Sequence, residues 1–222
     1  MLVFHVKHAL RDCWPVAVGL FPLGVAFGLV ITQAGFAWWW ATIFSIVIYA
    51  GSMEFLAVSL ISGGVGVLSA TFAGFLVNFR HIFYGLTFPR SVIKSRLARL
   101  YSTYALTDEC YALTAGKKDV SSQYLLSVQV ICQLAWVLSG TLGALAGAVV
   151  PTLPGFEFAL TALFVVLALD AFRASRDLSL IVTALASCLV GNMALALCVF
   201  FGLLLLRFRF ERLDELLTWR LP

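Results

Sequence analysis

The chain has 222 residues, of which 62% are hydrophobic and only 12% are charged. Charged residues make up about a quarter of an ordinary soluble domain, so this composition argues against a water-soluble fold. It also leaves no polar segment long enough to form a soluble enzyme domain, a nucleic-acid-binding module or a disulfide-linked secreted domain. The net charge of +4 is therefore assigned to the cytoplasmic loops of a membrane protein, where basic residues gather.

Three long stretches of the chain are almost free of charge. Between Asp12 and Arg80 the only acidic or basic residue is Glu54, and there is none at 120–156 or at 178–206. A helix needs about 20 mostly apolar residues to cross the hydrocarbon layer. The sequence therefore predicts an all-α polytopic membrane protein with about six to seven transmembrane helices, some of which are candidates for interruption.

We expect one integral membrane domain over 1–222, with two halves at 14–100 and 120–206 joined by a short polar helix at 101–115. The predicted apolar runs lie, in chain order, at 14–32, 36–61, 65–88, 124–150, 156–172 and 178–206. The arm before them carries Lys7 and Arg11 and lacks a small-residue cleavage site. It is expected to stay in place as a cytoplasmic N-terminus.

The positions of the basic residues conflict with a simple count of spans. Basic clusters lie at the N-terminus, at 90–99, at 117–118 and at 207–212. Clusters on one side of the membrane must be separated by an even number of crossings. Three apolar runs, however, lie between the N-terminus and 90–99, and three more lie between 117–118 and 207–212. A broken or re-entrant helix in each half, at 51–52 and at 191–192, would resolve the conflict. Corresponding breaks are typical of inverted-repeat transporters, and tilt of the long runs is the plain alternative.

Glu54 is an isolated acid beside Gly51 and Ser52, where the second apolar run is predicted to break. Ionisable groups inside a membrane are costly and usually functional. A low dielectric favours the protonated carboxyl, which suits a group that carries a coupling proton or meets a substrate ammonium group. The alternative is that a neutral Glu54 only caps or hydrogen-bonds the helix break.

Asn78, Arg80 and His81 form a second polar cluster, inside the third apolar run. On a helix, Asn78 and His81 share one face. Arg80 is a candidate to bind a substrate carboxylate bidentately or to neutralise Glu54. Alternatively, Arg80 extends to a lipid headgroup, and His81 donates an interhelical hydrogen bond instead of relaying protons.

Asp108 and Glu109 are adjacent acids on the predicted helix 101–115, where Asp108 shares a face with the neighbouring tyrosines. Together they could bind an ammonium group or a cation, or support gating. The alternative is an interfacial helix whose acids face water. The five cysteines are scattered without a CxxC pattern, and neither HExxH nor GxSxG occurs. The sequence thus predicts no metal, no cofactor and no enzyme.

Four motifs of these residues carry a family resemblance. They are Pro22-x-Gly24-x-x-x-Gly28, the segment 49–55, Asn78-Phe79-Arg80-His81-x-x-Tyr84 and Thr107-Asp108-Glu109-x-Tyr111-Ala112. In order and spacing the chain resembles AzlC-type proteins of the azaleucine-resistance family, the large subunit of branched-chain amino acid exporters. The resemblance covers essentially the whole chain and is most specific over 15–115. The family usually has Gln where this chain has Glu54.

The resemblance implies export of branched-chain or related amino acids across the bacterial inner membrane, together with a small AzlD-type membrane subunit. From the residues we expect proton coupling and a site in which small apolar faces around Gly24, Gly28 and Gly51 accommodate a branched side chain. A homo-oligomer is also considered, and no nucleic acid is expected as a partner. The alternatives are a membrane assembly or scaffold subunit that transports nothing, and a channel for small solutes.

Overall fold

The computed structural model describes residues 2–114, 117, 120–151, 165, 169, 172–173, 178–190 and 193–209. Every regular element among these residues is a helix, which confirms the predicted all-α class. The chain forms two compact units. One contains Met1–Gly64 and Val77–Phe156, and the other contains Val65–Leu76 and Glu157–Pro222.

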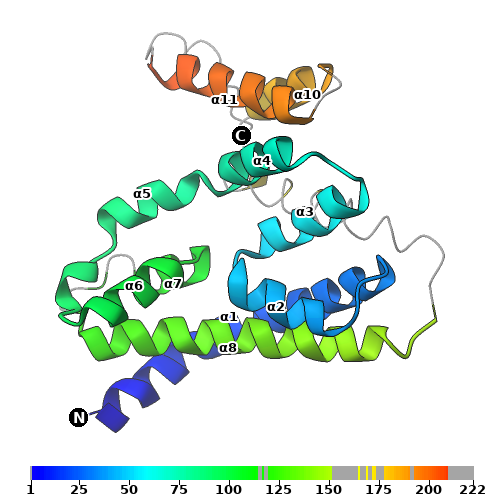
Figure 1. Ribbon diagram of the computed structural model, residues 1–222. Helices are drawn as coiled ribbons and strands as arrows, with labels where there is room; N and C mark the ends of the chain where they lie inside the picture. The colour runs from blue at the N-terminus through cyan, green and yellow to red at the C-terminus, as the bar shows by residue number, and fades with distance from the viewer. Residues whose placement is uncertain are drawn as a thin grey trace. The chain divides into compact units, whose positions relative to one another are not determined.

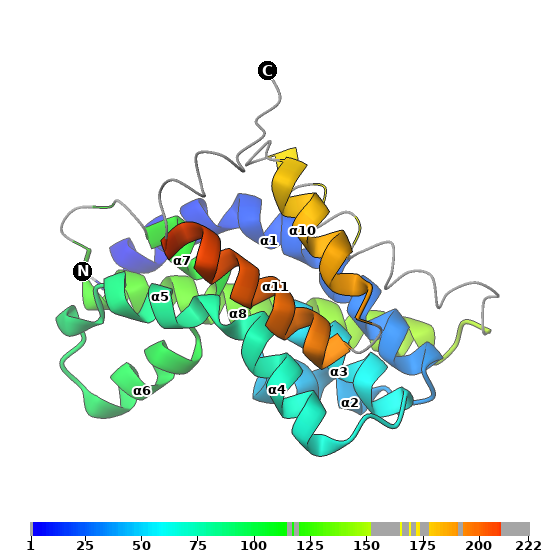
Figure 2. The same cartoon turned by 90° about the horizontal axis from the view of Figure 1, so that it is seen from above.

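Two helices of the first unit are long and apolar enough to cross a membrane. They are α1 (Leu2–Gln33), whose apolar part is Val6–Gln33, and α8 (Ser122–Gly147). Figures 1 and 2 both show α1 and α8 lying side by side. The predicted cytoplasmic arm is part of α1 itself, because this helix begins at Leu2 and continues through Pro15 and Pro22.

Helices α1 and α8 run parallel, as their paired residues show. Toward their N-terminal ends the hydroxyl of Tyr124 donates to Asp12 (2.6 Å). At the C-terminal end of α1, Gln33 Nε2 donates to the carbonyl of Val150, just past the end of α8 (3.4 Å). In an inverted repeat the first helices of the two halves would be antiparallel. These two helices therefore do not support the possible inverted repeat.

Small residues allow the backbones of α1 and α8 to come close together. A Cβ atom on Gly28 would overlap the carbonyl of Gly140, and one on Gly143 would overlap the backbone of Val25. Such close approach of small residues is typical of helix pairs in membranes, where apolar area alone gives little driving force. The glycines of the first predicted span thus permit close helix contact.

Shorter helices complete the first unit (Figure 1). They are α2 (Trp39–Val47), α3 (Gly51–Ser62), α5 (Arg80–Thr87), the 3₁₀-helix η1 (Arg90–Val92), α6 (Arg96–Tyr104) and α7 (Asp108–Thr114). The second apolar run is thus broken at 48–50, directly before the predicted position at 51–52. The third run is divided as well, into α4 (Val67–Asn78) and α5, which end and begin on either side of Phe79 within the predicted polar cluster.

The stretch predicted as one short helix, 101–115, belongs in the structure to two helices separated by 105–107. Leu106 is buried in an apolar cluster with Phe88, Ile93 and Leu125, which draws the backbone out of a helical path. Thr107 directly precedes α7, and its carbonyl accepts the N–H of Tyr111 (2.9 Å). The predicted single face of three tyrosines and Asp108 therefore does not form.

In the second unit, α10 (Leu178–Cys188) packs against α11 (Met193–Arg209). The buried side chain of Arg207 donates to the hydroxyl of Ser179. The predicted break at 191–192 lies outside the described residues, as do most residues of the predicted span 156–172. The helices on either side of that break end at Cys188 and begin at Met193.

Three of the cysteines meet in the core of the first unit. Cys13 of α1, Cys110 of α7 and Cys132 of α8 are buried in one cluster with Tyr124 and apolar neighbours. Of the cysteines, only Cys188 and Cys198 are exposed. The three buried cysteines therefore serve as small members of this core.

Candidate functional site

The break between α2 and α3 forms the first part of the candidate site. Tyr49 has φ +43°, a left-handed conformation that is uncommon for a residue with a large side chain. Ala50 is extended, with φ −146° and ψ 96°, and α3 begins at Gly51. The left-handed residue ends α2, and the extended residue redirects the chain. Glu54 consequently lies in the first turn of α3, near its positive end.

Glu54 is fully buried, with an exposed fraction of 0%, and both of its carboxyl oxygens accept hydrogen bonds. The hydroxyl of Ser45 donates to Oε2 (2.9 Å). The backbone N–H of Ala50 (3.2 Å) and Nε1 of Trp136 (2.8 Å) both donate to Oε1. All three donors are neutral groups, and they come from α2, the break and α8. The carboxyl is thus held by preorganised dipoles instead of by a cation.

Gly51 lets α8 approach this helix start closely. A Cβ atom at Gly51 would lie 3.1 Å from Cη2 of Trp136. The Trp136 ring also stacks on Phe27 of α1, with ring centroids 6.3 Å apart. Ser52 is half-buried on the same turn. The predicted site residues Gly51 and Ser52 therefore lie in the same first turn of α3 as Glu54, although Gly51 makes room for a tryptophan and not for a ligand.

The same holds for the small apolar faces predicted around Gly24 and Gly28. A Cβ atom on Gly24 would overlap the side chain of Ser139, and one on Gly28 would overlap Gly140. These faces are occupied by α8. The expectation that they accommodate a branched substrate side chain is wrong, because the same small residues are used for helix packing.

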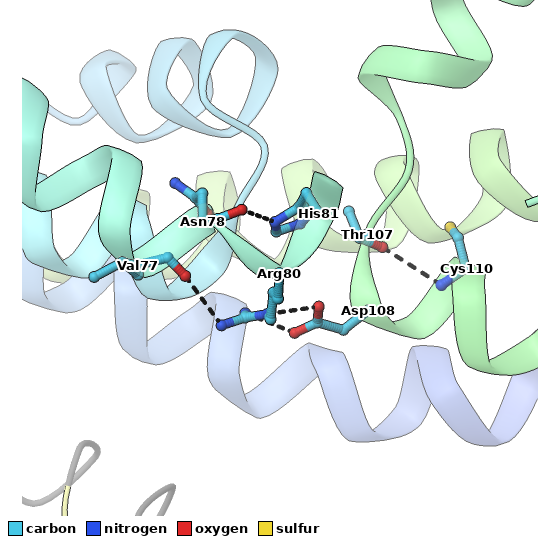
Figure 3. Close-up of polar contacts among 7 residues, drawn as sticks. All are labelled: Val77, Asn78, Arg80, His81, Thr107, Asp108 and Cys110. Atoms are coloured by element: carbon cyan, nitrogen blue, oxygen red, sulfur yellow. Dashed lines mark hydrogen bonds and ion pairs between the residues drawn. The ribbon is translucent and has the colours of Figure 1, made fainter. Parts of the chain in front are cut away.

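Arg80 and Asp108 form the second part of the candidate site (Figure 3). Nε of Arg80 donates to Oδ1 of Asp108 (2.9 Å), and Nη2 donates to Oδ2 (2.7 Å). Nη1 donates to the carbonyl of Val77 (3.3 Å). This is the bidentate, charge-assisted geometry in which Arg binds carboxylates best. The two side chains are 42% and 44% exposed, so the pair is accessible.

The other residues of the predicted cluster lie beside this pair. Nδ1 of His81 is 3.0 Å from the carbonyl of Asn78, as Figure 3 shows, so the two residues interact as their spacing predicts. The His81 ring also lies edge-on to Tyr84, with centroids 5.5 Å apart. Glu109 is half-buried and follows Asp108 on α7, about 100° further around the helix. Only Asp108 of the two acids pairs with Arg80.

Aromatic stacking supports the pair from the side of α5 and α7. The rings of Tyr84 and Tyr111 stack with centroids 4.4 Å apart and an interplanar angle of 15°. The hydroxyls of Thr87 and Tyr111 are 2.8 Å apart. These contacts hold α5 against α7. Arg80 at the start of α5 therefore faces Asp108 at the start of α7.

A third polar cluster lies at the N-terminal ends of α1 and α8. The ammonium group of Lys117 donates to the carboxylate of Asp12 and to the hydroxyl of Tyr124, and it lies 4.6 Å from the centre of the Tyr124 ring. Desolvation alone would lower the pKa of Lys117. The hydrogen bonds to Asp12 and Tyr124 outweigh that effect and leave the pKa raised, so this lysine remains charged.

The structure excludes one of the roles predicted for Arg80. It does not neutralise Glu54, because the guanidinium is bound to Asp108 and Val77 while the oxygens of Glu54 are taken by neutral donors. The Glu54 centre and the Arg80–Asp108 pair therefore share no hydrogen bond among the described residues.

Ser45 and Trp136 are the site residues that sequence reasoning missed. Ser45 attracts attention only as one of several serines spaced by seven residues. Trp136 lies in a featureless apolar run 82 positions after Glu54. Only the packing of α8 against α1 brings its indole to the break.

These features define an integral membrane protein with buried and half-buried charged groups at helix breaks and helix starts. The chain matches a family model described as AzlC protein over residues 15–150, and it belongs to the AzlC family. The matched range contains Glu54 with its hydrogen-bond donors and the Arg80–Asp108 pair.

Several relatives span most of the chain. The branched-chain amino acid transport protein AzlC of Bacillus subtilis is 28% identical over 171 residues, covering 73% of this chain and 67% of that protein. The inner membrane protein YgaZ of Escherichia coli is 30% identical over 197 residues, 83% and 78% of the two chains. A Helicobacter pylori protein named only as a membrane protein is 28% identical over 178 residues, 76% and 78%. No solved structure matches the chain.

Proposed function

We propose that this chain is a secondary transporter that exports branched-chain or related amino acids across the bacterial cytoplasmic membrane, in exchange for entering protons. Its similarity to the Bacillus protein, whose name states branched-chain amino acid transport, supports the substrate class. Direction and coupling are argued from the charged groups of the site.

The ion pair of Arg80 and Asp108 is the observation that carries the proposal. An amino acid has one carboxylate and one ammonium group. Its carboxylate can replace Asp108 on the guanidinium with the same bidentate geometry, while its ammonium group pairs with the released Asp108. Because the pair is about half exposed, substrate can reach it. Insertion of a zwitterion between the partners leaves no charge unpaired, which keeps the cost of binding low.

The neighbouring polar residues have supporting roles in this proposal. Asn78 and His81 position the start of α5 and thereby Arg80. Glu109 adds negative charge beside Asp108, which favours an approaching ammonium group and supports gating of the site. Gly51 and Ser52 shape the helix start around Glu54.

Glu54 is proposed to carry the coupling proton. Its partner Ser45 is a hydroxyl, which can donate or accept. When Glu54 is ionised, Ser45 donates to Oε2, as in the structure. When Oε2 binds a proton, the new O–H can donate to Ser45 while Oε1 keeps its bonds from Ala50 and Trp136. Both protonation states therefore have satisfied partners, as a group that must load and release a proton requires.

The transporter is further proposed to work with a small AzlD-type membrane subunit, to place its N-terminus in the cytoplasm and to perform no catalysis. The rival function is an assembly or scaffold subunit, for which the charged residues would serve only to join helices. Proteoliposomes containing this chain, with and without the small subunit, separate the two. A scaffold gives no leucine flux in either preparation.

The decisive variant is Glu54→Gln. Glutamine keeps an oxygen for Ala50 and Trp136 and an amide that can donate to Ser45, so the fold is preserved, but it cannot bind a proton in this pH range. In proteoliposomes, leucine export by the wild type should rise as the receiving side is acidified. Export by the variant should be at least about tenfold weaker and nearly independent of pH.

Export by Glu54→Gln that keeps the pH dependence of the wild type would exclude Glu54 from coupling. Ser59→Ala is a suitable control, because Ser59 is an exposed serine on the same helix α3. This control should retain both the rate and the pH profile of the wild type.

A further inference from the structure

Tyr104 joins the end of α6 to the helix break that holds Glu54. Its hydroxyl donates to the carbonyl of Ile46 in the last turn of α2, and it accepts a hydrogen bond from Nε2 of Gln133 (3.0 Å). The ring lies beside that of Tyr49, with centroids 5.9 Å apart. Tyr104 therefore contacts both the end of α2 and the left-handed residue that follows it.

The Ile46 carbonyl has a particular place in the break. In an uninterrupted helix it would accept the N–H of Ala50, four residues later. In this protein that backbone pair is divided, because the N–H of Ala50 donates to Oε1 of Glu54 (3.2 Å) and the carbonyl of Ile46 accepts from Tyr104. Two side chains thus replace one missing backbone bond. Inside a membrane an unpaired backbone group is especially costly, so the break depends on both of them.

We propose that Tyr104 is a positioning residue that closes the break between α2 and α3 and thereby fixes the carboxyl of Glu54. If Ile46 loses its donor, the most direct way to satisfy its carbonyl is to recover the bond from Ala50. That movement withdraws the Ala50 N–H from Glu54. The importance of Tyr104 for transport rests on the proposed coupling role of Glu54. The hydrogen bond from Tyr104 to Ile46 does not depend on that role.

The far side of Tyr104 is fixed to α8. Gln133 accepts a hydrogen bond from the hydroxyl of Tyr101 (2.8 Å) and donates to that of Tyr104. One turn earlier, Nε2 of the buried Gln129 donates to the carbonyls of Ser102 (2.8 Å) and Ala105 (3.3 Å). The last turn of α6 is therefore held against the helix that also supplies Trp136. The same helix supports Glu54 directly through Trp136 and indirectly through Tyr104.

Tyr104→Phe tests the proposal in the full chain, reconstituted in lipid nanodiscs. It removes the hydroxyl and keeps the ring beside Tyr49. Tyr101→Phe is the matched control, because it removes a neighbouring hydroxyl that also bonds to Gln133 but does not reach Ile46. Hydrogen–deuterium exchange is followed for the segment 46–54. Because the hydroxyl no longer holds the end of α2 against α6, the segment should open more often and exchange about fivefold faster in Tyr104→Phe, whereas Tyr101→Phe should exchange like the wild type.

A second readout reports on Glu54 itself and needs no transport. The infrared carboxyl band that disappears in Glu54→Gln is followed while the pH is varied. Losing the Ala50 donor disfavours the carboxylate, so Tyr104→Phe should raise the titration midpoint of this band by about one pH unit. Tyr101→Phe should leave the midpoint unchanged.

Equal exchange in the two tyrosine variants would overturn the proposal, and so would a midpoint that does not move in Tyr104→Phe. Both measurements are independent of substrate. Absence of leucine flux from the wild-type protein would contradict the proposed function without affecting this result.

Discussion

Glu54 and Arg80 satisfy their charges in different ways. Glu54 is fully buried among neutral donors, whereas Arg80 is half-exposed and bound to an opposite charge. A group surrounded by neutral dipoles can change its protonation state without leaving a counter-ion unpaired. A charge pair at an accessible position can instead exchange one partner for a ligand. The two residues are thus suited to different steps of transport.

Arg80→Lys tests the bidentate contact. Lysine keeps the positive charge but presents a single point donor in place of the planar fork. Loss of one charge-assisted hydrogen bond, about 1.5–3 kcal/mol, should raise the KM for leucine export about tenfold or more. Initial rates of export at a series of leucine concentrations measure this change.

Arg90→Lys is the matched control, since Arg90 is exposed on the 3₁₀-helix η1. Its KM should match that of the wild type. A KM for Arg80→Lys within twofold of the control would remove Arg80 from substrate recognition.

Among individual residues, the charged members of the site can be found from the sequence, whereas their neutral partners cannot. Glu54, Arg80 and Asp108 can be recognised because charge is rare in apolar runs and therefore conspicuous. Ser45 and Trp136 resemble the many other serines and aromatic residues of the chain. The choice of Asp108 over Glu54 as the partner of Arg80 depends on helix packing, which no local spacing specifies.

Among the elements, the parallel pair of α1 and α8 positions the Trp136 side of the Glu54 centre. Glycines at their interface bring the backbones together and so place Trp136 against the start of α3. Close packing of this kind is intolerant of added volume, since neither backbone can move away without disturbing the remaining contacts.

Gly28→Ala should therefore destabilise the protein. The added methyl group would overlap the backbone of Gly140, and overpacking of this kind costs about 1–3 kcal/mol. Thermal unfolding of the detergent-solubilised chain should show a lower Tm.

Gly19→Ala is the matched control on the same helix, because a Cβ atom there would meet nothing within 4 Å. Alanine favours helix over glycine by about 1 kcal/mol, so the control should melt at the same temperature as the wild type or slightly higher. Equal Tm values for the two variants would mean that the α1–α8 contact does not limit stability.

Helix breaks are predicted from the sequence with uneven success. The break before Gly51 can be foreseen because a glycine, a serine and a charge interrupt an apolar run. The break at 105–107 cannot, because it arises when Leu106 is drawn into a tertiary cluster, and burial overrides the local helical pattern. The other predicted break, at 191–192, lies outside the described residues and stays a prediction.

For the whole molecule, the parallel course of α1 and α8 constrains the topology. Because both helices start at the same end, the segment between them must return to the starting side of the membrane. The helices in this segment have 9 (α2), 12 (α3), 12 (α4) and 8 (α5) residues, fewer than the roughly 20 needed for one crossing. We therefore expect this return to be built from broken helices, as the odd number of apolar runs in the sequence also predicts.

Lys7 and Lys94 are expected on the same, cytoplasmic side. Lys117 binds Asp12 at the N-terminal end of α1. Lys94 and Lys117 are separated by α6 and α7, which have 9 and 7 residues and are both too short to cross. Lys7→Cys and Lys94→Cys should react with an impermeant maleimide only from the cytoplasm, whereas Val149→Cys, beyond the far end of α8, should react only from outside.

This labelling requires a background in which the exposed Cys188 and Cys198 are replaced by serine, while the three buried cysteines are kept. Reaction of Lys7→Cys and Lys94→Cys from opposite sides would refute the topology. That outcome would mean an odd number of crossings between Lys7 and Lys94, and the two basic clusters could not both be cytoplasmic.

The distance along the chain between the partners of Glu54 has a consequence for biogenesis. Ser45 and Ala50 are synthesised with Glu54, but Trp136 emerges from the ribosome 82 residues later. Helix α1 likewise enters the membrane long before α8, whose glycines complete its packing surface. Until α8 is inserted, Glu54 in the nascent chain lacks its bond from Trp136, and the small-residue face of α1 stays uncovered. Truncation before α8 should consequently expose the chain to membrane proteases, and this late step sets when the acid reaches its final environment.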